Sequence, residues 1–241
     1  MRNSVAYGEE RIAFSVRFLP GSRRRIAIHV MPDGSVRVDA PESSDAREVN
    51  EVVRRHAPWV WRQVSARRAR ACHVLPREYV SGETHFYLGR RHLLKVQPAA
   101  RAQSGVRLWR GRLEVATLQR DADTVRRLLE SWYRERASEV FARVLAELAP
   151  RMRPSLPLPE WRLRAMRTQW GSCSPKGGLL FNPDLVKAPK PCIEYVVAHE
   201  LCHLQEHNHS DRFRRLLGTV LPDWELRKAE LDDMAEQVLR R

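Results

Sequence analysis

The stretch Cys192–His209, CIEYVVAHELCHLQEHNH, holds four of the nine histidines of the chain and decides the fold that we expect. His199 and His203 are four residues apart, so on a helix their imidazoles lie on one face, a single turn apart. Two imidazoles at this spacing are typical ligands of a tetrahedral zinc ion. Glu200 would then project beside the metal, where it can act as the general base for a water whose pKa the zinc lowers.

The residues before this pair favour a buried helix. Ile193–Ala198 is mostly apolar and compatible with a helix, which places the histidines on an element that faces the core. A short HExxH pattern also arises by chance, and the alternative is a helix with no metal. Burying two imidazoles and a carboxylate without a metal would leave their polar atoms unsatisfied. We therefore expect a metal site.

The third ligand must come from outside this helix, and His209, ten residues after His199, is the candidate that we favour. To reach the metal, the chain has to turn between Gln205 and Asn208, and asparagine tolerates the left-handed conformation that such a turn can need. His207 competes with His209, but on an unbroken helix it would lie two turns from His199 and too far round to share the ion. Further candidates, as ligands or as acceptors for the imidazole N–H groups, are the carboxylates Glu194, Glu206 and Asp211.

Outward from this stretch, the 241 residues divide near residue 120 into two kinds of pattern. Residues 1–120 contain short, β-branched, alternating stretches with Gly and Pro between them, and the first three, at residues 11–19, 24–30 and 35–39, predict an antiparallel meander. One helix, capped by Ser43 or Ser44 and interrupted by Pro58, is expected within them. From Asp121 the apolar residues follow a helical period for about 28 residues. The sequence shows no internal repeat.

We therefore predict an α+β fold with two domains. A β-rich, basic accessory domain would occupy residues 1–120, and a mainly helical catalytic domain would occupy residues 121–241. In the second domain, strands at Trp161–Arg167 and Leu179–Asn182 would form a small antiparallel sheet, with a turn at Trp170-Gly171-Ser172 between them.

The net charge of +14 predicts polyanionic partners such as nucleic acid or nucleotides. Most of the excess lies in residues 1–120, which hold 23 basic and 11 acidic side chains. A base-composition bias of the genome is the alternative explanation, because 38 of the 43 basic residues are arginine. The candidate polyanion-binding residues are Arg23, Arg24, Arg25, Arg67, Arg68 and Arg70.

The four cysteines, Cys72, Cys173, Cys192 and Cys202, form no CxxC pair and no disulfide framework, so we expect reduced thiols. The first ten residues are polar, and no apolar run approaches the length of a membrane span. The sequence therefore predicts a cytoplasmic, soluble protein that does not enter a membrane.

Segments around the histidines resemble those of one family. They are Arg164–Ser174 (RAMRTQWGSCS), Gly178–Asn182 (GLLFN), Ala188-Pro189, Ile193–His203, and Asn208–Ser210 with Phe213. In this order and spacing, they are similar to the YgjP-like metallopeptidase family, relatives of the SprT-like and WLM zinc proteases. Three more segments are similar to the β-rich leader of the family, namely Arg24–Ala40, Pro58-Trp59 and Gly82–Leu88. The resemblance thus covers almost the whole chain.

The resemblance implies a zincin-like catalytic domain built around an HExxH active-site helix. It implies that His199, His203 and His209 bind one Zn²⁺ per chain and that Glu200 is the catalytic base. Arg214 departs from the family, in which an aromatic residue commonly follows the Phe, and this change concerns the packing behind the third ligand.

Four residues are candidates for the rim of the site or for contact with substrate: Trp170, Asn182, Tyr195 and His207. Trp170 lies in the turn expected at the rim, and the strand that ends at Asn182 would offer an edge to an extended peptide. Tyr195 or His207 would support the oxyanion. Alternatively, Trp170 belongs to the core and Gly171 only supplies a backbone conformation.

Cys173 has two interpretations. It is either a small buried apolar side chain or a thiolate that closes the metal site as a fourth ligand. A closed site would be structural, whereas an open one leaves a position for water.

Peptide-bond hydrolysis is the function that the residues and the resemblance favour, with a peptide or protein as substrate. A zinc-dependent hydrolase of nucleotide phosphoanhydrides is one alternative, because zinc and a base can act on other electrophiles and the arginines could hold phosphates. A nucleic-acid-associated protease, docked through the basic N-terminal half, is another. The non-enzymatic alternative is a zinc ion that only stabilises the fold.

Overall fold

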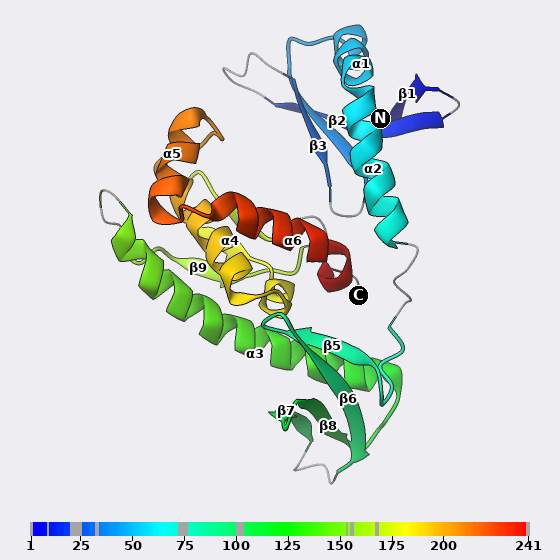
Figure 1. Cartoon of the computed structure of the whole chain (residues 1–241), viewed down its shortest axis with the longest axis vertical. Helices are drawn as coiled ribbons and strands as arrows, with labels where there is room; N and C mark the ends of the chain where they lie inside the picture. Colours follow the sequence, from blue (N-terminus) through cyan, green and yellow to red (C-terminus); the bar gives the residue numbers. More distant parts are fainter. Residues whose placement is uncertain are drawn as a thin grey trace. The chain divides into compact units, whose positions relative to one another are not determined.

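The computed structural model describes residues 2–8, 10–19, 26–31, 34–71, 77–99, 104–152, 154, 157–166 and 169–239. They form an α+β structure that divides into two compact units, Met1–Leu75 and Pro76–Arg241 (Figure 1). The boundary expected after residue 120 therefore lies inside the second unit.

The first unit contains a four-stranded sheet. Its strands are β1 (Arg2–Tyr7), β2 (Glu10–Leu19), β3 (Ala27–Val30) and β4 (Val36–Pro41), in the order β1-β2-β4-β3. The two outer pairs are antiparallel, but β2 and β4 run parallel. The expected antiparallel meander is thus wrong at the centre of the sheet. There β2 pairs with β4, and β3 lies at the edge of the sheet.

Two helices, α1 (Ala46–Arg55) and α2 (Ala57–Ala71), share one hydrophobic core with this sheet. Asp45 is the N-cap of α1, and its side chain accepts a hydrogen bond from a backbone N–H of the first turn. The serine cap expected from the sequence is therefore wrong. The expected interruption is confirmed, because α1 ends and α2 begins just before Pro58.

The second unit begins with a sheet of the same strand order. Its strands are β5 (Thr84–Tyr87), β6 (Arg90–Pro98), β7 (Gly105–Trp109) and β8 (Arg112–Thr117), in the order β5-β6-β8-β7 with β6 parallel to β8. The two hairpins turn at Leu88-Gly89 and Arg110-Gly111, and all four residues have positive φ, which fits two-residue turns of type I′. One topology is thus repeated, although the sequence shows no internal repeat.

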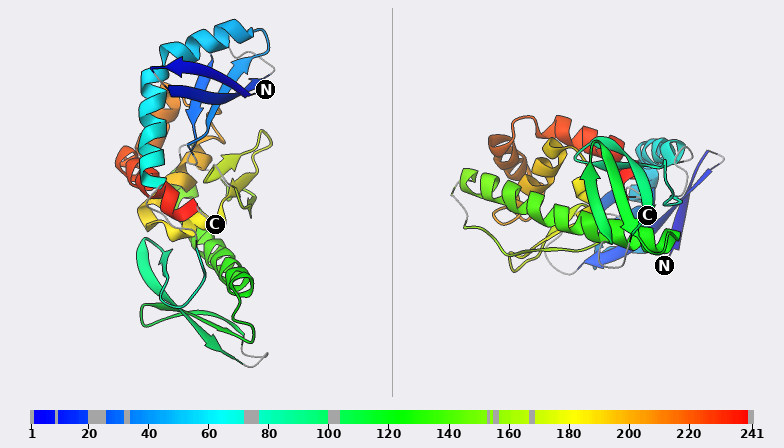
Figure 2. Two further views of the ribbon diagram at one scale, coloured as in Figure 1. Left: turned by 90° about the vertical axis from the view of Figure 1, so that its right-hand side faces the viewer. Right: turned by 90° about the horizontal axis from the view of Figure 1, so that it is seen from below.

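Helix α3 (Ala122–Leu148) explains why this sheet belongs to the second unit. Its N-cap is Asp121, as the change of period predicted to within a residue. Leu113 and Val115 of β8 are fully buried in the same core cluster as Leu129 of α3. α3 contacts both this sheet and the following helices (Figures 1 and 2). Cutting the chain after residue 120 would therefore expose a common core.

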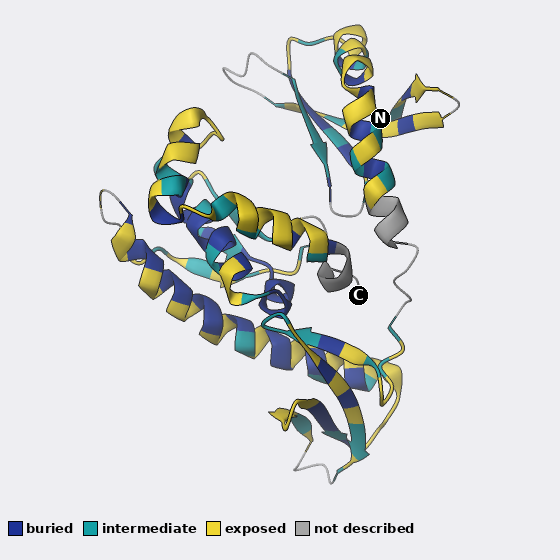
Figure 3. Ribbon diagram, in the orientation of Figure 1, coloured by how far each residue is buried: buried dark blue, intermediate teal, exposed yellow. Residues whose placement is uncertain are grey.

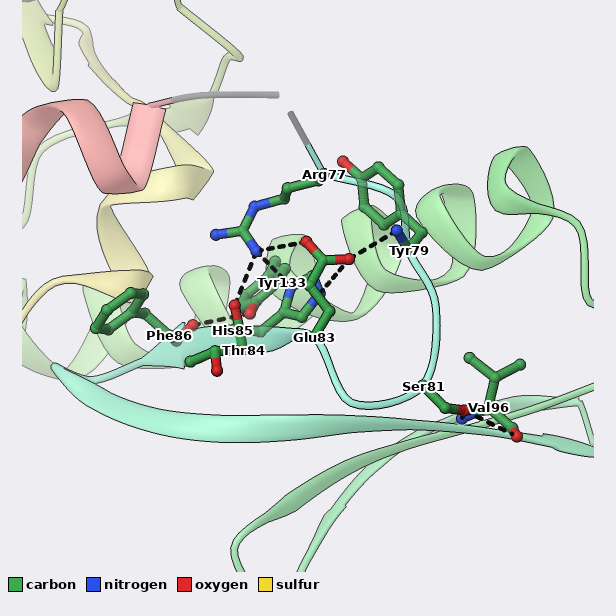
Figure 4. A network of polar contacts seen from close by, with 9 residues as sticks. All are labelled: Arg77, Tyr79, Ser81, Glu83, Thr84, His85, Phe86, Val96 and Tyr133. Atoms are coloured by element: carbon green, nitrogen blue, oxygen red, sulfur yellow. Dashed lines mark hydrogen bonds and ion pairs between the residues drawn. The ribbon is translucent and has the colours of Figure 1, made fainter. Parts of the chain in front are cut away.

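A polar network also ties β5 and the segment before it together (Figure 4). Arg77 donates to the Glu83 carboxylate at 3.1 Å and to the carbonyl of Thr84 at 2.9 Å. The hydroxyl of Tyr133 on α3 donates to the carbonyl of Phe86 at 2.8 Å. His85 is buried here, and burial, followed by the charge of Arg77, lowers its pKa to about 3. The imidazole of His85 is therefore neutral at physiological pH.

A three-stranded sheet follows α3 and the 3₁₀ helix η2 (Ala149–Arg151). It consists of β9 (Trp161–Leu163), β10 (Gly171–Cys173) and β11 (Leu179–Phe181), in the order β10-β11-β9. β11 is antiparallel to β10 and parallel to β9. The expected antiparallel pairing of the first and last of these strands is therefore wrong. The expected turn at residues 170–172 is also wrong, because most of it belongs to β10.

The chain continues through η3 (Pro183–Lys187), α4 (Lys190–Cys202), α5 (Asp211–Val220) and α6 (Trp224–Leu239). α4 contacts α3, α5, α6 and β10, so it is the central helix of the second unit. Most of its residues are buried (Figure 3). None of the helices in the described part of the chain is long and apolar enough to cross a membrane.

Candidate metal centre

The last turn of α4 carries the first part of the histidine cluster. Residues 196–198 are buried directly before His199, and Glu200 is 6% exposed. The helix ends at Cys202, and His203 is its C-cap residue. This central helix therefore fixes two imidazoles and one carboxyl group at its end.

A turn after α4 brings the third histidine back. The N–H of Glu206 donates to the carbonyl of Cys202 at 2.9 Å, which closes the turn. Ser210 is the N-cap of α5. His209 lies between the closed turn and the cap, so its backbone is held on both sides.

The three imidazoles converge on one point. The Nε2 atom of His199 lies 3.2 Å from that of His203 and 3.0 Å from that of His209, and the latter two are 3.2 Å apart. Ligand nitrogens of a tetrahedral zinc ion lie about 3.3 Å apart, given a Zn–N distance of about 2.0–2.1 Å. In the described part of the chain, this is the group of three that could hold a metal ion. The donor set therefore fits a zinc ion.

The protonation of the imidazoles also suits a metal. Nδ1 of His203 lies 3.0 Å from the carbonyl oxygen of Glu206. A carbonyl only accepts, so Nδ1 carries the hydrogen and Nε2 presents its lone pair to the cluster. Burial lowers the pKa of His203, and burial followed by the two neighbouring histidines lowers that of His199 to about 3. Both imidazoles are therefore neutral, as a metal ligand must be.

The ring of Phe213, on α5, packs against all three imidazoles of the cluster. Its ring centroid lies 5.0 Å from that of His199, 4.7 Å from that of His203 and 4.9 Å from that of His209. The side chain is 2% exposed, so it cannot move aside easily. Sequence reasoning placed Phe213 in the family pattern but gave it no role. Its spacing of four residues from His209, on the next helix, was the available signal.

Glu200 lies against β10 at a point where there is no side chain. A Cβ placed on Gly171 would lie 2.7 Å from Oε1 and 2.8 Å from Cγ of Glu200. The φ of Gly171 lies outside the left-handed region, so its conformation does not require glycine. The close approach of the Glu200 side chain therefore explains the glycine at position 171. The special backbone conformation suggested by the sequence does not explain it. Burial raises the pKa of Glu200 to about 8.

Asn182 does not lie at a rim, because it is fully buried. Its side-chain amide donates to the carbonyls of Met166 and Gln169, at 2.7 and 3.1 Å, and its Oδ1 accepts from the N–H of Asp184. The expected contact with substrate is therefore wrong. Asn182 instead ties down the segment that leads into β10. Trp170, at the start of that strand, is partly buried and packs on the main core.

Tyr195 and His207, the candidate oxyanion donors, differ in their surroundings. Tyr195 is 8% exposed and stacks on Trp224 at 6.4 Å, and its ring centroid lies 5.8 Å from that of His199. Burial raises the pKa of its hydroxyl, which therefore stays protonated. His207 is exposed and does not belong to the group of converging imidazoles.

The alternative carboxylate ligands are engaged by arginines. Glu194 forms an ion pair with Arg227, Glu206 with Arg212 at 2.7 Å, and Asp211 with Arg214 at 2.8 Å. The arginine that departs from the family pattern belongs to the last pair, in which both side chains are exposed. None of these three carboxylates belongs to the metal-binding group found among the described residues.

Cys173 is half-buried at the end of β10, and its thiol lies outside the same group. Burial, followed by the nearby charge of Glu200, raises its pKa. Among the described residues, the three imidazoles converge without this thiol. The structure thus favours a site with an open position.

The six arginines proposed to bind polyanions cannot be assigned a surface. Arg23, Arg24 and Arg25 lie outside the described residues. Arg67, Arg68 and Arg70 belong to the backbone of α2, but their side chains lie outside the described part of the structure.

Converging imidazoles beside a buried glutamate are typical of metal-dependent hydrolases. The family model described as "YgjP-like, metallopeptidase domain" matches residues 24–234, and the chain belongs to this family. Membership makes the chain a metallopeptidase-type hydrolase with a peptide or protein substrate and implies a metal ion.

Among solved structures, the chain is similar to the crystal structure of the metallopeptidase zymogen of Pyrococcus abyssi abylysin. The two chains are 22% identical over 42% of this chain and 97% of that one, with a TM-score of 0.36. Comparison with curated proteins gives no match.

Proposed function

We propose that the chain is a zinc-dependent metallopeptidase, in which His199, His203 and His209 hold one Zn²⁺ ion and Glu200 is the general base. The observation that carries this proposal is the convergence of three Nε2 atoms, 3.0–3.2 Å apart, next to a buried carboxyl group. The metallopeptidase family supports it. When bound, the ion would supply Lewis acidity to the scissile carbonyl and lower the pKa of a water.

In this proposal, Glu200 moves a proton. Its burial favours the neutral carboxyl group, with a pKa of about 8, whereas a nearby divalent cation favours the carboxylate. The carboxylate can accept a proton from the attacking water at Oε1 or Oε2. It then delivers that proton to the nitrogen of the amine that leaves as the C–N bond breaks. The close packing of Gly171 on Oε1 and Cγ holds the carboxyl group in place.

We propose that an extended peptide pairs with β10. The strand expected to offer an edge, residues 179–182, is β11 and has partners on both sides. β10 pairs with β11 alone among the described strands, so its other side can accept a peptide backbone. Because Gly171 of β10 touches Glu200, a peptide on this edge would run beside the general base.

Glu200→Gln tests the proposal most directly. The variant keeps the volume of the side chain but cannot accept the proton, so we expect normal zinc content and at least about a 100-fold loss of turnover. The matched control is Glu225→Gln, on the exposed face of α6. Zinc is measured by mass spectrometry, and turnover with peptides, unfolded proteins and nucleoside triphosphates.

Three outcomes contradict the proposal. Turnover that survives in Glu200→Gln removes Glu200 from the role of base. Cleavage of nucleoside triphosphates without cleavage of peptides removes the peptidase assignment. Zinc that stabilises the chain without any hydrolysis favours a structural ion.

A further inference from the structure

The sheet formed by β5–β8 has one covered face and one outward face. Leu94, Leu113 and Val115 are 0–2% exposed and belong to the core cluster that includes α3. Side chains alternate along a strand, so their neighbours point to the other side. Leu93, next to Leu94, is 51% exposed on that side, and so is Trp109, at 52%, which pairs by register with Arg112, the neighbour of Leu113.

Basic residues dominate this outward side. By register, Trp109 lies opposite Arg112, and Arg107 and Lys95 flank Glu114. We name the surface the basic sheet face and define it by six residues: Arg91, Lys95, Arg107, Trp109, Arg110 and Arg112. All six are exposed.

The charge of the basic sheet face is largely uncompensated. Between Thr84 and Thr117 the sequence has seven basic residues and one acidic residue, Glu114. Glu114 is 7% exposed, and it pairs with Arg107 at 2.8 Å and with Lys95 at 3.8 Å. The other arginines of the face, Arg91, Arg110 and Arg112, form no ion pair among the described residues, although the charge of Arg112 helps to lower the pKa of Glu114. A polyanion would therefore meet guanidinium groups that no ion pair occupies.

The exposed indole of Trp109 adds an aromatic ring to the charged surface. The guanidinium carbons of Arg107 and Arg110 lie 5.7 and 5.6 Å from the ring centroid of Trp109. Arg91 lies 5.7 Å from the ring centroid of Phe86, on the neighbouring hairpin. Aromatic rings among arginines suit stacking with nucleic-acid bases while the arginines contact phosphates.

We propose that the basic sheet face binds single-stranded nucleic acid, with a base on Trp109 and the backbone along Arg110 and Arg112. A single strand is favoured over a duplex because only its unpaired bases expose a face to the indole. The first sheet lacks this combination, although its topology is the same. Its outward acid, Asp39, pairs with Arg37 and His29, and its exposed aromatic residues, Tyr7 and Phe18, lie by register on the side of the buried residues.

The test uses the full zinc-loaded chain and a fluorescent single strand of about 12 nucleotides. Fluorescence anisotropy is measured between about 50 and 200 mM salt. Trp109→Ala should weaken binding about 10-fold with an unchanged salt slope, because stacking is lost and no charge is removed. Arg110→Ser with Arg112→Ser should reduce the slope of log K against log salt by roughly 1.4.

The matched control is Arg127→Ser with Arg143→Ser, which removes two exposed charges from α3 and leaves the sheet intact. It should keep at least half of the binding affinity. Circular dichroism and thermal melting establish that each variant is folded.

Equal losses in the control and the Arg110/Arg112 variant would overturn the proposal, because net charge alone would then explain binding. An unchanged affinity in Trp109→Ala would overturn it as well. Duplexes, polyglutamate and phosphatidylserine vesicles serve as competing ligands. Preference for any of them over the single strand would assign the face to that class of partner instead.

Discussion

The second unit contains two surfaces of opposite design, the histidine cluster and the basic sheet face. The cluster consists of three converging imidazoles and a buried carboxyl group, positioned by the end of α4, the start of α5 and β10. The basic sheet face consists of exposed, charged side chains on one side of a sheet. The difference fits the two tasks proposed for these surfaces. Bond cleavage depends on a few fixed atoms, whereas capture of a polymer depends on charge spread over a surface.

The positive charge of the chain is not confined to its first unit. Residues 1–75 hold 14 basic and 8 acidic residues, and residues 76–120 hold 9 and 3, so each segment carries a net charge of +6. Half of the excess assigned to an accessory domain thus belongs to the unit that contains the histidine cluster. Substitutions in the histidine cluster should leave binding of single-stranded nucleic acid unchanged. Substitutions in the basic sheet face should leave peptide hydrolysis unchanged.

His209→Ala should separate the two surfaces most strongly. Loss of one of three ligands should lower zinc affinity at least about 100-fold and abolish peptide hydrolysis. Binding of single-stranded nucleic acid should remain as in the unchanged chain. Zinc per chain is measured by mass spectrometry after dialysis. The control is His207→Ala, and a greater loss of zinc in that variant would identify His207 as the ligand.

Gly171→Ala should impair turnover without removing the metal. The new methyl group would lie 2.7 Å from Oε1 of Glu200, so the carboxyl group must shift. A displacement of this size costs about 100-fold in kcat, while zinc content stays normal. Gly105→Ala, where no heavy atom lies within 4 Å of the added Cβ, is the control and should retain full activity. Normal kinetics in Gly171→Ala would show that Glu200 needs no fixed position.

Replacing His85 of β5 (His85→Asn) should change how the free energy of unfolding depends on pH. The pKa of His85 is lowered from 6.5 to about 3, so below pH 6.5 the unfolded chain binds a proton that the folded chain does not. Stability from this group is therefore complete above pH 6.5 and is lost as the pH falls toward 3. Between pH 7 and 5 the unchanged chain should lose about 2 kcal/mol more unfolding free energy than the variant.

This effect is measured by urea unfolding of both zinc-free proteins at the two pH values. The ionisation of carboxylates and of the other histidines is common to both chains and cancels. Parallel pH profiles for the two proteins would contradict a neutral, buried His85.

The smallest effect expected is that of Trp109→Ala on hydrolysis of a short peptide. The indole lies on the outward side of the β5–β8 sheet, whereas Glu200 contacts β10, so kcat/KM should stay within about twofold. Steady-state kinetics with a short fluorogenic peptide measure this. A large loss would mean that the two surfaces act on the same ligand, and the division of tasks would fail.

Local patterns in the sequence predicted much of the histidine cluster and of the individual elements. The spacing of His199, His203 and His209 is local, and the structure brings all three together. Gly89 and Gly111 lie in hairpin turns with positive φ, which agrees with the expectation that glycines separate the alternating stretches. The same holds for α3, whose apolar period defined its start and its length.

Long-range pairing was not accessible in the same way. The alternation in β8 predicted a strand with one buried side, but nothing local showed that α3 covers Leu113 and Val115. The parallel pairs β2–β4 and β6–β8 depend on which strand of each hairpin lies inward. The role of Gly171 became visible only when β10 was placed against Glu200, 29 positions further along the chain.

The position of His209 links the metal to the mechanics of the chain. This residue directly precedes Ser210, the N-cap of α5, while His199 belongs to the end of α4. An ion bound to both would act as a cross-link between two helices that are otherwise joined by a short turn. Part of its binding free energy would then appear as local stability of α5. Occupancy of the centre would thus set how firmly α5, and with it the ring of Phe213, is held in the fold.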